Sequence, residues 1–317
     1  MTSLLSYLEK RAEEEKLKEE HGTGIKSLKP WFKPYPHQKK AIDRLFRNRG
    51  KMILAHEMGT GKTVTAVYGF EKMRNEGKAK KALVVVPSGL RQNFAKEGVE
   101  KFTNSSWQVV GSSSEVRKKS NYVRPGSEGD KDYTVVSYAH FRRDPKGLME
   151  RTGADTIIFD EFHKTRNERA GTFRAAIEAR SKAVNVMGLT ASIINNKPEE
   201  IATLMTITEG KRMMSTAQFR SRYVETVGFT KGFGGKKVKV KGLKNTEHLK
   251  GVVQPRVDYV ETGDIMGKSM PVKSVSNVDV EMSPRQYQLY QLAMKKLGPL
   301  KSRIVRGDEN VTVRDAE

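Results

Sequence analysis

A glycine-bearing loop between an apolar strand and an apolar-striped helix constrains this chain more than any other feature. The loop reads LAHEMGTGKT over residues 54–63, after the apolar run 52–55 and before a helix predicted over 64–73. A triphosphate needs backbone N–H groups that point inward from a turn free of side chains, and Gly59 and Gly61 permit such a turn. The segment therefore predicts a phosphate-binding loop.

Two residues after the glycines supply the chemistry that such a loop needs. Lys62 brings a positive charge to the outer phosphates and Thr63 a hydroxyl to Mg²⁺, while the helix that follows adds the positive end of its dipole. His56 stands where the strict pattern has glycine, and we interpret it as a packing or loop residue. The alternative is a chance Gly-Lys-Thr in a strand-to-helix turn. The loop residues predicted to bind the nucleotide are Met58, Gly59, Thr60, Gly61, Lys62 and Thr63.

An apolar run that ends in two carboxylates predicts the second half of the site. Residues 156–163 read TIIFDEFH, which is typical of a buried parallel strand, and open α/β sheets bind ligands at the carboxyl ends of their strands. Asp160 is predicted to hold Mg²⁺ through water, and Glu161 to polarise the water that attacks the γ-phosphate. Taken alone, Asp-Glu after a strand is more often the start of a helix. Paired with the loop, it is a Walker B candidate.

With both motifs placed, the chain resembles the superfamily 2 helicases and translocases, and within them the SWI/SNF-type remodelling ATPases, over about residues 34–290. Glu57-Met58 before the glycines is similar to that branch's phosphate loop, and residues 160–163 to its Asp-Glu-x-His box. The resemblance implies that ATP is the nucleotide, that His163 joins the γ-phosphate site to the next motif, and that Gln38 reads the adenine edge.

Residues 188–192, GLTAS, resemble the element that couples hydrolysis to nucleic-acid contact, and this implies that Thr190 and Ser192 relay the nucleotide state. The SWI/SNF pattern has Gly-Thr-Pro where this chain has Ala191-Ser192-Ile193. Thr-Ala-Ser is closer to other superfamily 2 branches.

Two further segments, 85–94 and 135–138, resemble loops that strands deliver to a nucleic-acid backbone. Arg166, just past the acidic box, fits either a backbone contact or a solvated charge. The side chains predicted from these segments to contact nucleic acid are Ser88, Arg91, Ser137, Tyr138 and Arg166.

Residues 278–290 resemble the bridge that leads into the family's second lobe, and no motif of that lobe appears before Glu317. The family takes its arginine fingers from the second lobe, and such a finger is worth roughly 10³–10⁵ in rate. We therefore expect ATP hydrolysis by residues 1–317 alone to be weak, with a second lobe in cis or from a partner chain as the missing component.

A lysine-rich segment after the last predicted helix reads as a hairpin over 228–242, with lysines alternating with valines around a Gly-Gly turn. A basic ribbon of this kind fits phosphates, and Lys236, Lys237 and Lys239 are predicted to contact nucleic acid. The alternative, weighed about evenly, is an edge ribbon whose lysines discourage aggregation.

Charge agrees with a nucleic-acid partner. The chain carries 59 Lys and Arg against 37 Asp and Glu, a net charge of +22, so an acidic polymer is its natural partner, although a merely soluble basic protein is the alternative. It has no cysteine, which excludes disulfides and thiolate chemistry. Without an apolar run of about 20 residues or a signal peptide, the expected location is the cytoplasm of a bacterial or viral host cell, or the nucleus in a eukaryote.

Strands and helices alternate from residue 51 to about 208, which predicts a mostly parallel α/β sheet covered by helices on both faces; the resemblance implies a RecA-like P-loop NTPase lobe. Residues 111–132 are predicted to be a surface loop. The strands and helices are expected at 52–55, 64–73, 82–86, 89–101, 133–138, 155–160, 172–180, 183–187 and 198–208. The expected domains are a charged helical arm and linker (1–29, with the helix at 4–20), the ATP-binding lobe (30–225), a basic hairpin insertion (226–270) and the bridge (271–317).

These observations predict an ATP-dependent nucleic-acid motor that hydrolyses ATP to ADP and phosphate, with Lys62, Asp160, Glu161 and His163 as its catalytic residues and duplex DNA as the favoured partner. Two alternatives stay open. A non-catalytic DNA-binding or assembly subunit keeps the fold without the chemistry. A nucleotide kinase shares the phosphate loop, but needs an arginine-rich lid and an acceptor pocket in place of the Asp-Glu-x-His box.

Overall fold

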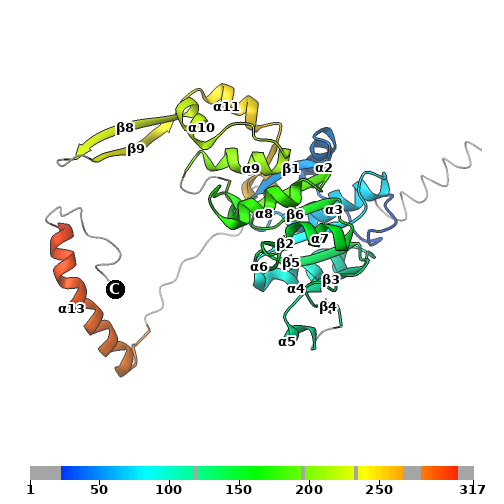
Figure 1. Cartoon of the computed structure of the whole chain (residues 1–317), viewed down its shortest axis with the longest axis horizontal. Coiled ribbons are helices and arrows are strands. Elements are labelled where there is room, and N and C mark those ends of the chain that lie inside the picture. Colours follow the sequence, from blue (N-terminus) through cyan, green and yellow to red (C-terminus); the bar gives the residue numbers. More distant parts are fainter. Residues whose placement is uncertain (1–22, 118–119, 194–196, 232–234, 267–279, 306–317) are drawn as a thin grey trace, which may run out of the picture. The chain divides into compact units, whose positions relative to one another are not determined.

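A computed structural model describes residues 23–117, 120–193, 197–231, 235–266 and 280–305 (Figure 1). The chain divides into two units, residues 1–269 and 270–317, and the described part of the second unit holds one helix, α13 (Pro284–Val305). The predicted charged helix at 4–20 lies outside the described residues. In the described part, no helix is long and apolar enough to cross a membrane.

The first unit is built on an eight-stranded sheet in which every paired strand runs parallel, in the order β10-β1-β7-β6-β2-β5-β3-β4. This confirms the predicted α/β class. The strands are β1 (Lys51–His56), β2 (Ala82–Val86), β3 (Trp107–Val110), β4 (Tyr122–Val123), β5 (Tyr133–Ser137), β6 (Thr156–Phe159), β7 (Asn185–Thr190) and β10 (Val257–Val260). Strands β8 (Val224–Lys231) and β9 (Gly235–Leu243) form a separate antiparallel hairpin.

Short and medium helices connect these strands. They are α2 (Pro36–Arg47), α3 (Lys62–Asn75), η1 (Ser88–Leu90), α4 (Arg91–Asn93), η2 (Phe94–Glu100), α5 (Ser113–Val116), α6 (Tyr138–Phe141), α7 (Pro145–Thr152), η3 (Phe162–Thr165), α8 (Gly171–Arg180), α9 (Glu200–Glu209), α10 (Thr216–Tyr223), α11 (Thr246–Val253) and α12 (Thr262–Met266).

The core lies on both faces of the sheet because its central strands are apolar at successive positions. In β1, Ile53 belongs to the cluster that packs under α7, α8 and α9, whereas Met52 and Leu54 belong to the cluster under α2, α3 and η2. Side chains of a strand alternate between faces, so a continuous apolar run is what a sheet covered on both sides requires.

Several predicted boundaries are wrong in informative ways. The predicted linker before residue 30 packs on the body, since Ile25 and Leu28 are buried and Leu28 forms a β-bridge with Thr103. The predicted surface loop 111–132 contains α5 and the edge strand β4. The predicted helix 89–101 is a 3₁₀ turn, a short α-helical piece and a π-helix in succession.

The predicted insertion 226–270 is wrong in its C-terminal part. Its hairpin is confirmed, although it begins at Val224 and its turn, 232–234, lies outside the described residues. After α11, however, the chain returns to the main sheet, where β10 pairs in parallel with the edge of β1. The sequence offers little signal for this four-residue strand, VDYV, because it has a carboxylate at its second position.

Asp258 is the buried charge that holds β10 to the sheet. Its side chain is 5% exposed; Oδ1 accepts a hydrogen bond from Arg44 Nη1 at 2.6 Å, and Oδ2 lies 2.7 Å from His56 Nε2. Burial acts to raise the pKa of the Asp258 carboxyl, but His56 and Arg44 together outweigh burial and leave that pKa below its ordinary value. The carboxylate is therefore ionised and bridges α2, β1 and β10.

We expect Asp258→Ala to lower the free energy of unfolding by about 3 kcal/mol, because it leaves a half-buried guanidinium and a buried imidazole without their shared acceptor. Urea denaturation followed by circular dichroism measures the loss. The matched control is Asp43→Ala on α2, whose carboxylate is 64% exposed and lies 3.8 Å from Lys72; its cost should stay below about 1 kcal/mol. Equal losses in the two variants would contradict the bridging role.

Candidate nucleotide-binding site

The predicted phosphate loop lies between the carboxyl end of β1 and the amino end of α3. Gly59 and Gly61 adopt left-handed conformations, with φ of 82° and 80°, which side chains rarely tolerate. Gly61 is also the N-cap of α3, so the first free N–H groups of a 14-residue helix open onto the loop. Within the loop, Thr60 Oγ1 donates to the carbonyl oxygen of Glu57 at 2.7 Å.

Lys62 connects the loop to the acidic box. Its Nζ donates to the carbonyl oxygens of His56 and Glu57, at 2.8 and 2.9 Å. Burial lowers the pKa of Lys62, while the nearby carboxylates of Glu161, Asp160 and Glu57 act to raise it. The carboxylates of the acidic box, although far from the loop in sequence, therefore lie near enough for their charges to act on the Lys62 ammonium group.

The other loop residues differ in their surroundings. Thr63 is half-buried in the first turn of α3, and its methyl group lies against Gly98 of η2. Met58 is 81% exposed. Gln38 is buried; its Oε1 accepts from the backbone N–H of Tyr35, and its Nε2 lies so close to Gly61 that a Cβ there would come within 2.9 Å. The amino end of α2 is thereby placed directly beside the loop.

The acidic box is strained at Glu161. Asp160 follows β6, where its backbone N–H donates to the carbonyl oxygen of Val85, and its Oδ1 accepts from the N–H of Glu161 at 3.0 Å. Glu161 has φ 51° and ψ 51°, a left-handed conformation that costs a non-glycine residue about 1–3 kcal/mol. Such strain is typical of positions whose side-chain direction matters more than their local stability.

Burial, and secondly the charge of Glu161, raise the pKa of Asp160 to about 6. A carboxyl group with this pKa takes up a proton just below neutral pH. A cation beside this carboxyl group would favour its ionised form. Among the described residues, no group of three or more His, Cys, Asp or Glu side chains could hold a metal ion.

His163 links the acidic box to the predicted coupling element. Its Nδ1 lies 3.2 Å from Glu161 Oε2 and 3.3 Å from Thr190 Oγ1. Thr190 is fully buried, donates to the carbonyl oxygen of Ser192 at 2.9 Å and accepts from the Ser192 N–H at 3.2 Å. Burial lowers the pKa of His163, so the imidazole is neutral at pH 7. A continuous path therefore runs from Glu161 to Ser192.

Gly188 makes this path possible by allowing a close approach. It lies in β7, two residues before Thr190, and a Cβ at this position would come within 2.2 Å of the Phe162 ring. Phe162 is fully buried and stacks on Phe159. The ring packs closely against the glycine, and this close approach brings η3, with His163, to the end of β7.

The predicted nucleic-acid residues do not all face outward. Arg91 is buried, and its guanidinium donates to Ser88 O, Val110 O and Glu115 Oε1. Because all three partners are internal, the structure gives Arg91 a packing role in place of the predicted backbone contact. Ser88 itself is exposed at the start of η1.

Ser137 and Tyr138 also face inward, which corrects their prediction. Ser137 is buried and caps α6 by accepting from the N–H of His140. The Tyr138 hydroxyl donates to the carbonyl oxygen of Asp160 at 2.8 Å, and burial raises the pKa of this phenol. Tyr138 therefore supports the strained backbone of the acidic box.

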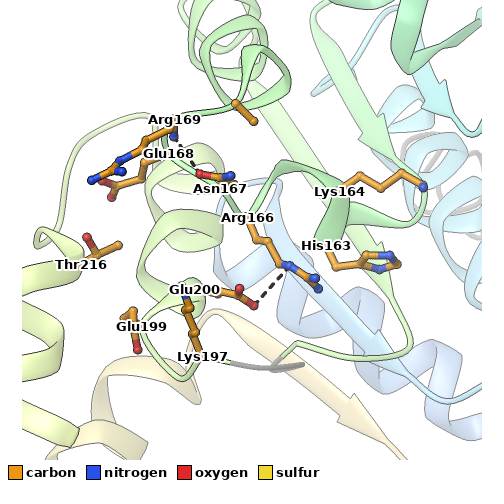
Figure 2. A pocket seen from close by; sticks show the side chains of 11 residues that line it. His163, Lys164, Arg166, Asn167, Glu168, Arg169, Lys197, Glu199, Glu200 and Thr216 are labelled. Atoms are coloured by element: carbon orange, nitrogen blue, oxygen red, sulfur yellow. Dashed lines mark hydrogen bonds and ion pairs between the residues drawn. The ribbon is translucent and has the colours of Figure 1, made fainter. Parts of the chain in front are cut away.

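Arg166 lies in a polar cleft of about 1000 Å³ next to the acidic box. Figure 2 shows its side chain turned toward Glu200, whose Oε2 lies 3.3 Å from Arg166 Nε. The guanidinium is thus paired and only partly exposed. The remaining lining residues are His163, Lys164, Asn167, Glu168, Arg169, Ala170, Lys197, Glu199 and Thr216. The hairpin lysines lie in β9, where Lys237 pairs with Phe229 and Lys239 with Val227.

Sequence reasoning missed one contributor to the site, the segment that follows β10. The N–H of Thr262 donates to Glu57 Oε2 at 2.9 Å and its Oγ1 donates to the Met58 carbonyl oxygen at 3.2 Å. His56, interpreted as a packing residue, makes a buried contact with Asp258. No short motif in the sequence marks either partner.

The chain is similar to curated helicases and DNA repair proteins. An uncharacterized ATP-dependent helicase of Bacillus subtilis, YqhH, is 28% identical over 263 residues, which cover 82% of this chain and 42% of the relative. The DNA repair and recombination protein RAD54-like of Gallus gallus is 27% identical and covers 87% of this chain and 40% of the relative. The chain thus spans about two fifths of the length of these curated relatives.

A solved structure shares the fold. The Sulfolobus solfataricus SWI2/SNF2 ATPase core, solved in complex with dsDNA, superposes with a TM-score of 0.55 at 21% identity and covers 88% of this chain and 54% of that one. The family model described as the SNF2-related domain matches residues 37–312. The resemblance inferred from the motifs is confirmed: the chain belongs to the SNF2-related domain family.

Proposed function

We propose that this chain is the ATP-binding lobe of a nucleic-acid-dependent motor that hydrolyses ATP to ADP and phosphate. The observation that carries the proposal is the path of contacts from Glu161 through His163 to Thr190. Beside it lies Lys62, whose charge interacts with those of Glu161 and Asp160. A loop that only binds nucleotide has no need of a strained carboxylate connected to a second loop. The curated relatives named as helicases and DNA repair proteins support the same proposal.

In this mechanism the loop from Gly59 to Thr63 binds the phosphates through its backbone N–H groups, and Lys62 exchanges its two carbonyl contacts for phosphate oxygens. Thr63 and Asp160 are the residues that would hold Mg²⁺, which neutralises charge on the phosphate oxygens when bound. Glu161 orients the attacking water. Gln38, whose Nε2 lies close to Gly61, is the proposed contact to the adenine.

Through His163, hydrolysis would also change the contacts of the coupling element, residues 190–192. Loss of the γ-phosphate changes what Glu161 contacts, and the His163 contact carries that change to Thr190 and Ser192. Bistable hydrogen-bond networks of this kind transmit ligand state between loops. We expect this change to alter the contact with nucleic acid. The positive charge that stabilises the transition state is expected from an arginine of a second lobe.

Duplex DNA is the proposed partner. The net charge of +22 supports an acidic polymer, and the Sulfolobus solfataricus core of the same fold was solved with dsDNA. Ser88 and the hairpin residues Lys236, Lys237 and Lys239 are the proposed contacts, since Arg91, Ser137 and Tyr138 face inward. The proposed location is wherever that DNA lies, the cytoplasm of a bacterial or viral host cell or the nucleus of a eukaryote.

Two substitutions separate a motor from a non-catalytic subunit. We expect Lys62→Ala to abolish ATP binding, because it removes the charge that faces the outer phosphates, and Glu161→Gln to keep binding but lower hydrolysis at least about 100-fold. Equilibrium binding of a fluorescent ATP analogue and phosphate release with and without duplex DNA measure the two effects. The non-catalytic subunit would be favoured if the wild type binds ATP but shows no hydrolysis that the Glu161→Gln substitution removes.

The pKa of Asp160 predicts the pH dependence of magnesium-supported binding. Because this pKa is about 6, the carboxylate is ionised at pH 7 and protonated progressively below pH 6. Mg²⁺-dependent ATP affinity should therefore fall about tenfold for each pH unit below 6. In Asp160→Asn the Mg²⁺-dependent part should be small at every pH. A wild-type profile that stays flat from pH 7 to pH 5 would contradict the assignment.

The hairpin lysines predict a salt effect. Each phosphate contact contributes roughly 0.9 to the slope of log affinity against log salt concentration, so replacing Lys236, Lys237 and Lys239 by Gln should reduce the slope by about 2.7. Fluorescence anisotropy with a DNA duplex between 50 and 200 mM salt measures it. The control replaces Lys78, Lys80 and Lys182, exposed lysines that precede β2 and β7 at the opposite end of the strands. An equal change in both triple variants would favour the aggregation-guard interpretation of the ribbon.

A further inference from the structure

A segment from the far end of the first unit runs along the edge of the nucleotide site. Strand β10 pairs with β1 over Val257–Val260, in register with residues 53–56. The pairing continues to the loop itself, because the N–H of Glu57 donates to the carbonyl oxygen of Val260 at 2.9 Å. The segment 257–262, which we call the clamp, therefore reaches the first residues of the phosphate loop.

Side chains fasten the two ends of the clamp. At one end Asp258 accepts hydrogen bonds from His56 and Arg44. At the other, Thr262 donates its N–H to the Glu57 carboxylate and its hydroxyl to the Met58 carbonyl oxygen. The Thr262 contacts lower the pKa of Glu57, as expected of hydrogen bonds that favour the ionised carboxylate.

His56 and Glu57, whose side chains contact the clamp, also contact Lys62 through their backbone. The carbonyl oxygens of His56 and Glu57 accept from Lys62 Nζ, while their side chains are held by the clamp. A peptide unit fixed through both its carbonyl and its side chain has little rotational freedom left. The clamp therefore restricts the backbone immediately before Gly59, where the phosphate-binding turn begins.

We propose that the clamp sets the conformation of the phosphate loop, and that Thr262 is a positioning residue for ATP binding. The inference rests on the proposed function, since it requires that the loop binds ATP. A loop that is competent for only a fraction of the time binds with an affinity reduced by that fraction. Releasing the clamp should thus weaken ATP binding, although the proposed nucleotide contacts, Gln38 and residues 58–63, include no clamp residue.

Thr262→Pro tests the clamp with little disturbance elsewhere. Thr262 is the first residue of α12, a position that suits proline because its N–H has no partner within the helix. The variant loses both contacts to the loop and keeps the helix start. We expect its affinity for a fluorescent ATP analogue with Mg²⁺ to fall about tenfold. Thr262→Ser keeps both donors and should bind within about twofold of wild type.

Glu57→Ala gives a second route to the same contact, from the loop side, in case the proline variant is poorly folded. It should weaken ATP binding to a similar extent, and combining it with Thr262→Pro should add little, because both remove one shared hydrogen bond. The thermal unfolding midpoint without nucleotide reports any general loss of structure. If the segment is a clamp, the variants should have a lower affinity for ATP and an unchanged unfolding midpoint. If the segment only completes the sheet edge, they should have a lower midpoint and an unchanged affinity for ATP.

The outcomes keep the two proposals apart. If wild type binds ATP and both Thr262→Pro and Glu57→Ala bind it equally well, the clamp is overturned and the proposed function stands. If the wild type binds no ATP, the proposed function is wrong, and the clamp proposal that rests on it is overturned with it. If Thr262→Ser is as weak as Thr262→Pro, the two hydrogen bonds are not the cause, and the positioning role is overturned as well.

Discussion

The parallel alignment of β1, β7 and β6 is the constraint on which the rest of the structure depends. These three strands are neighbours in the sheet, and because they run parallel their carboxyl ends meet at one edge. Each delivers one motif there: the phosphate loop after β1, the acidic box after β6 and the coupling element at the end of β7. Residues 56–63, 160–163 and 190–192 become neighbours through this order of strands, and no feature within any one motif would bring them together.

The site also brings together a strained residue and two partly desolvated charged groups. Glu161 holds a left-handed backbone conformation, Asp160 is buried with a raised pKa, and burial lowers the pKa of Lys62. Each feature disfavours the folded state relative to an ordinary residue at the same position. The surroundings offset this cost: the Tyr138 hydroxyl holds the Asp160 carbonyl oxygen, and Phe162 packs onto the bare backbone of Gly188. Strained groups persist only where the surrounding packing determines their conformation, and here that packing comes from the core.

The sequence predicted the parts of the fold and site whose signal is local. Glycines at 59 and 61 mark left-handed positions, and the apolar runs 52–55, 82–86 and 156–159 mark strands buried on both faces, because those patterns follow from backbone geometry and solvent exclusion. The failures share a different cause. Arg91 and Tyr138 stand at strand ends, as a nucleic-acid contact should, but adjacency to a strand end does not decide whether a side chain faces the solvent or the core. Strand β10 and Thr262 were missed because their partners lie about two hundred residues away, and no periodicity of so short a segment reports a distant pairing.

The long sequence separation between the phosphate loop and Thr262 bears on whether the loop can bind phosphate by itself. Thr262 and Glu57 are separated by 205 positions, and strands β2 to β10 lie between them in the chain. A Gly-x-Gly-Lys-Thr segment supplies the residue types for phosphate binding. In our proposal, the shape of its first turn is set by residues 257–262, which the motif does not contain. Closing so long a loop costs entropy that only cooperative burial of the sheet can repay. If the clamp acts as we propose, nucleotide affinity depends on the completed sheet as well as on the motif.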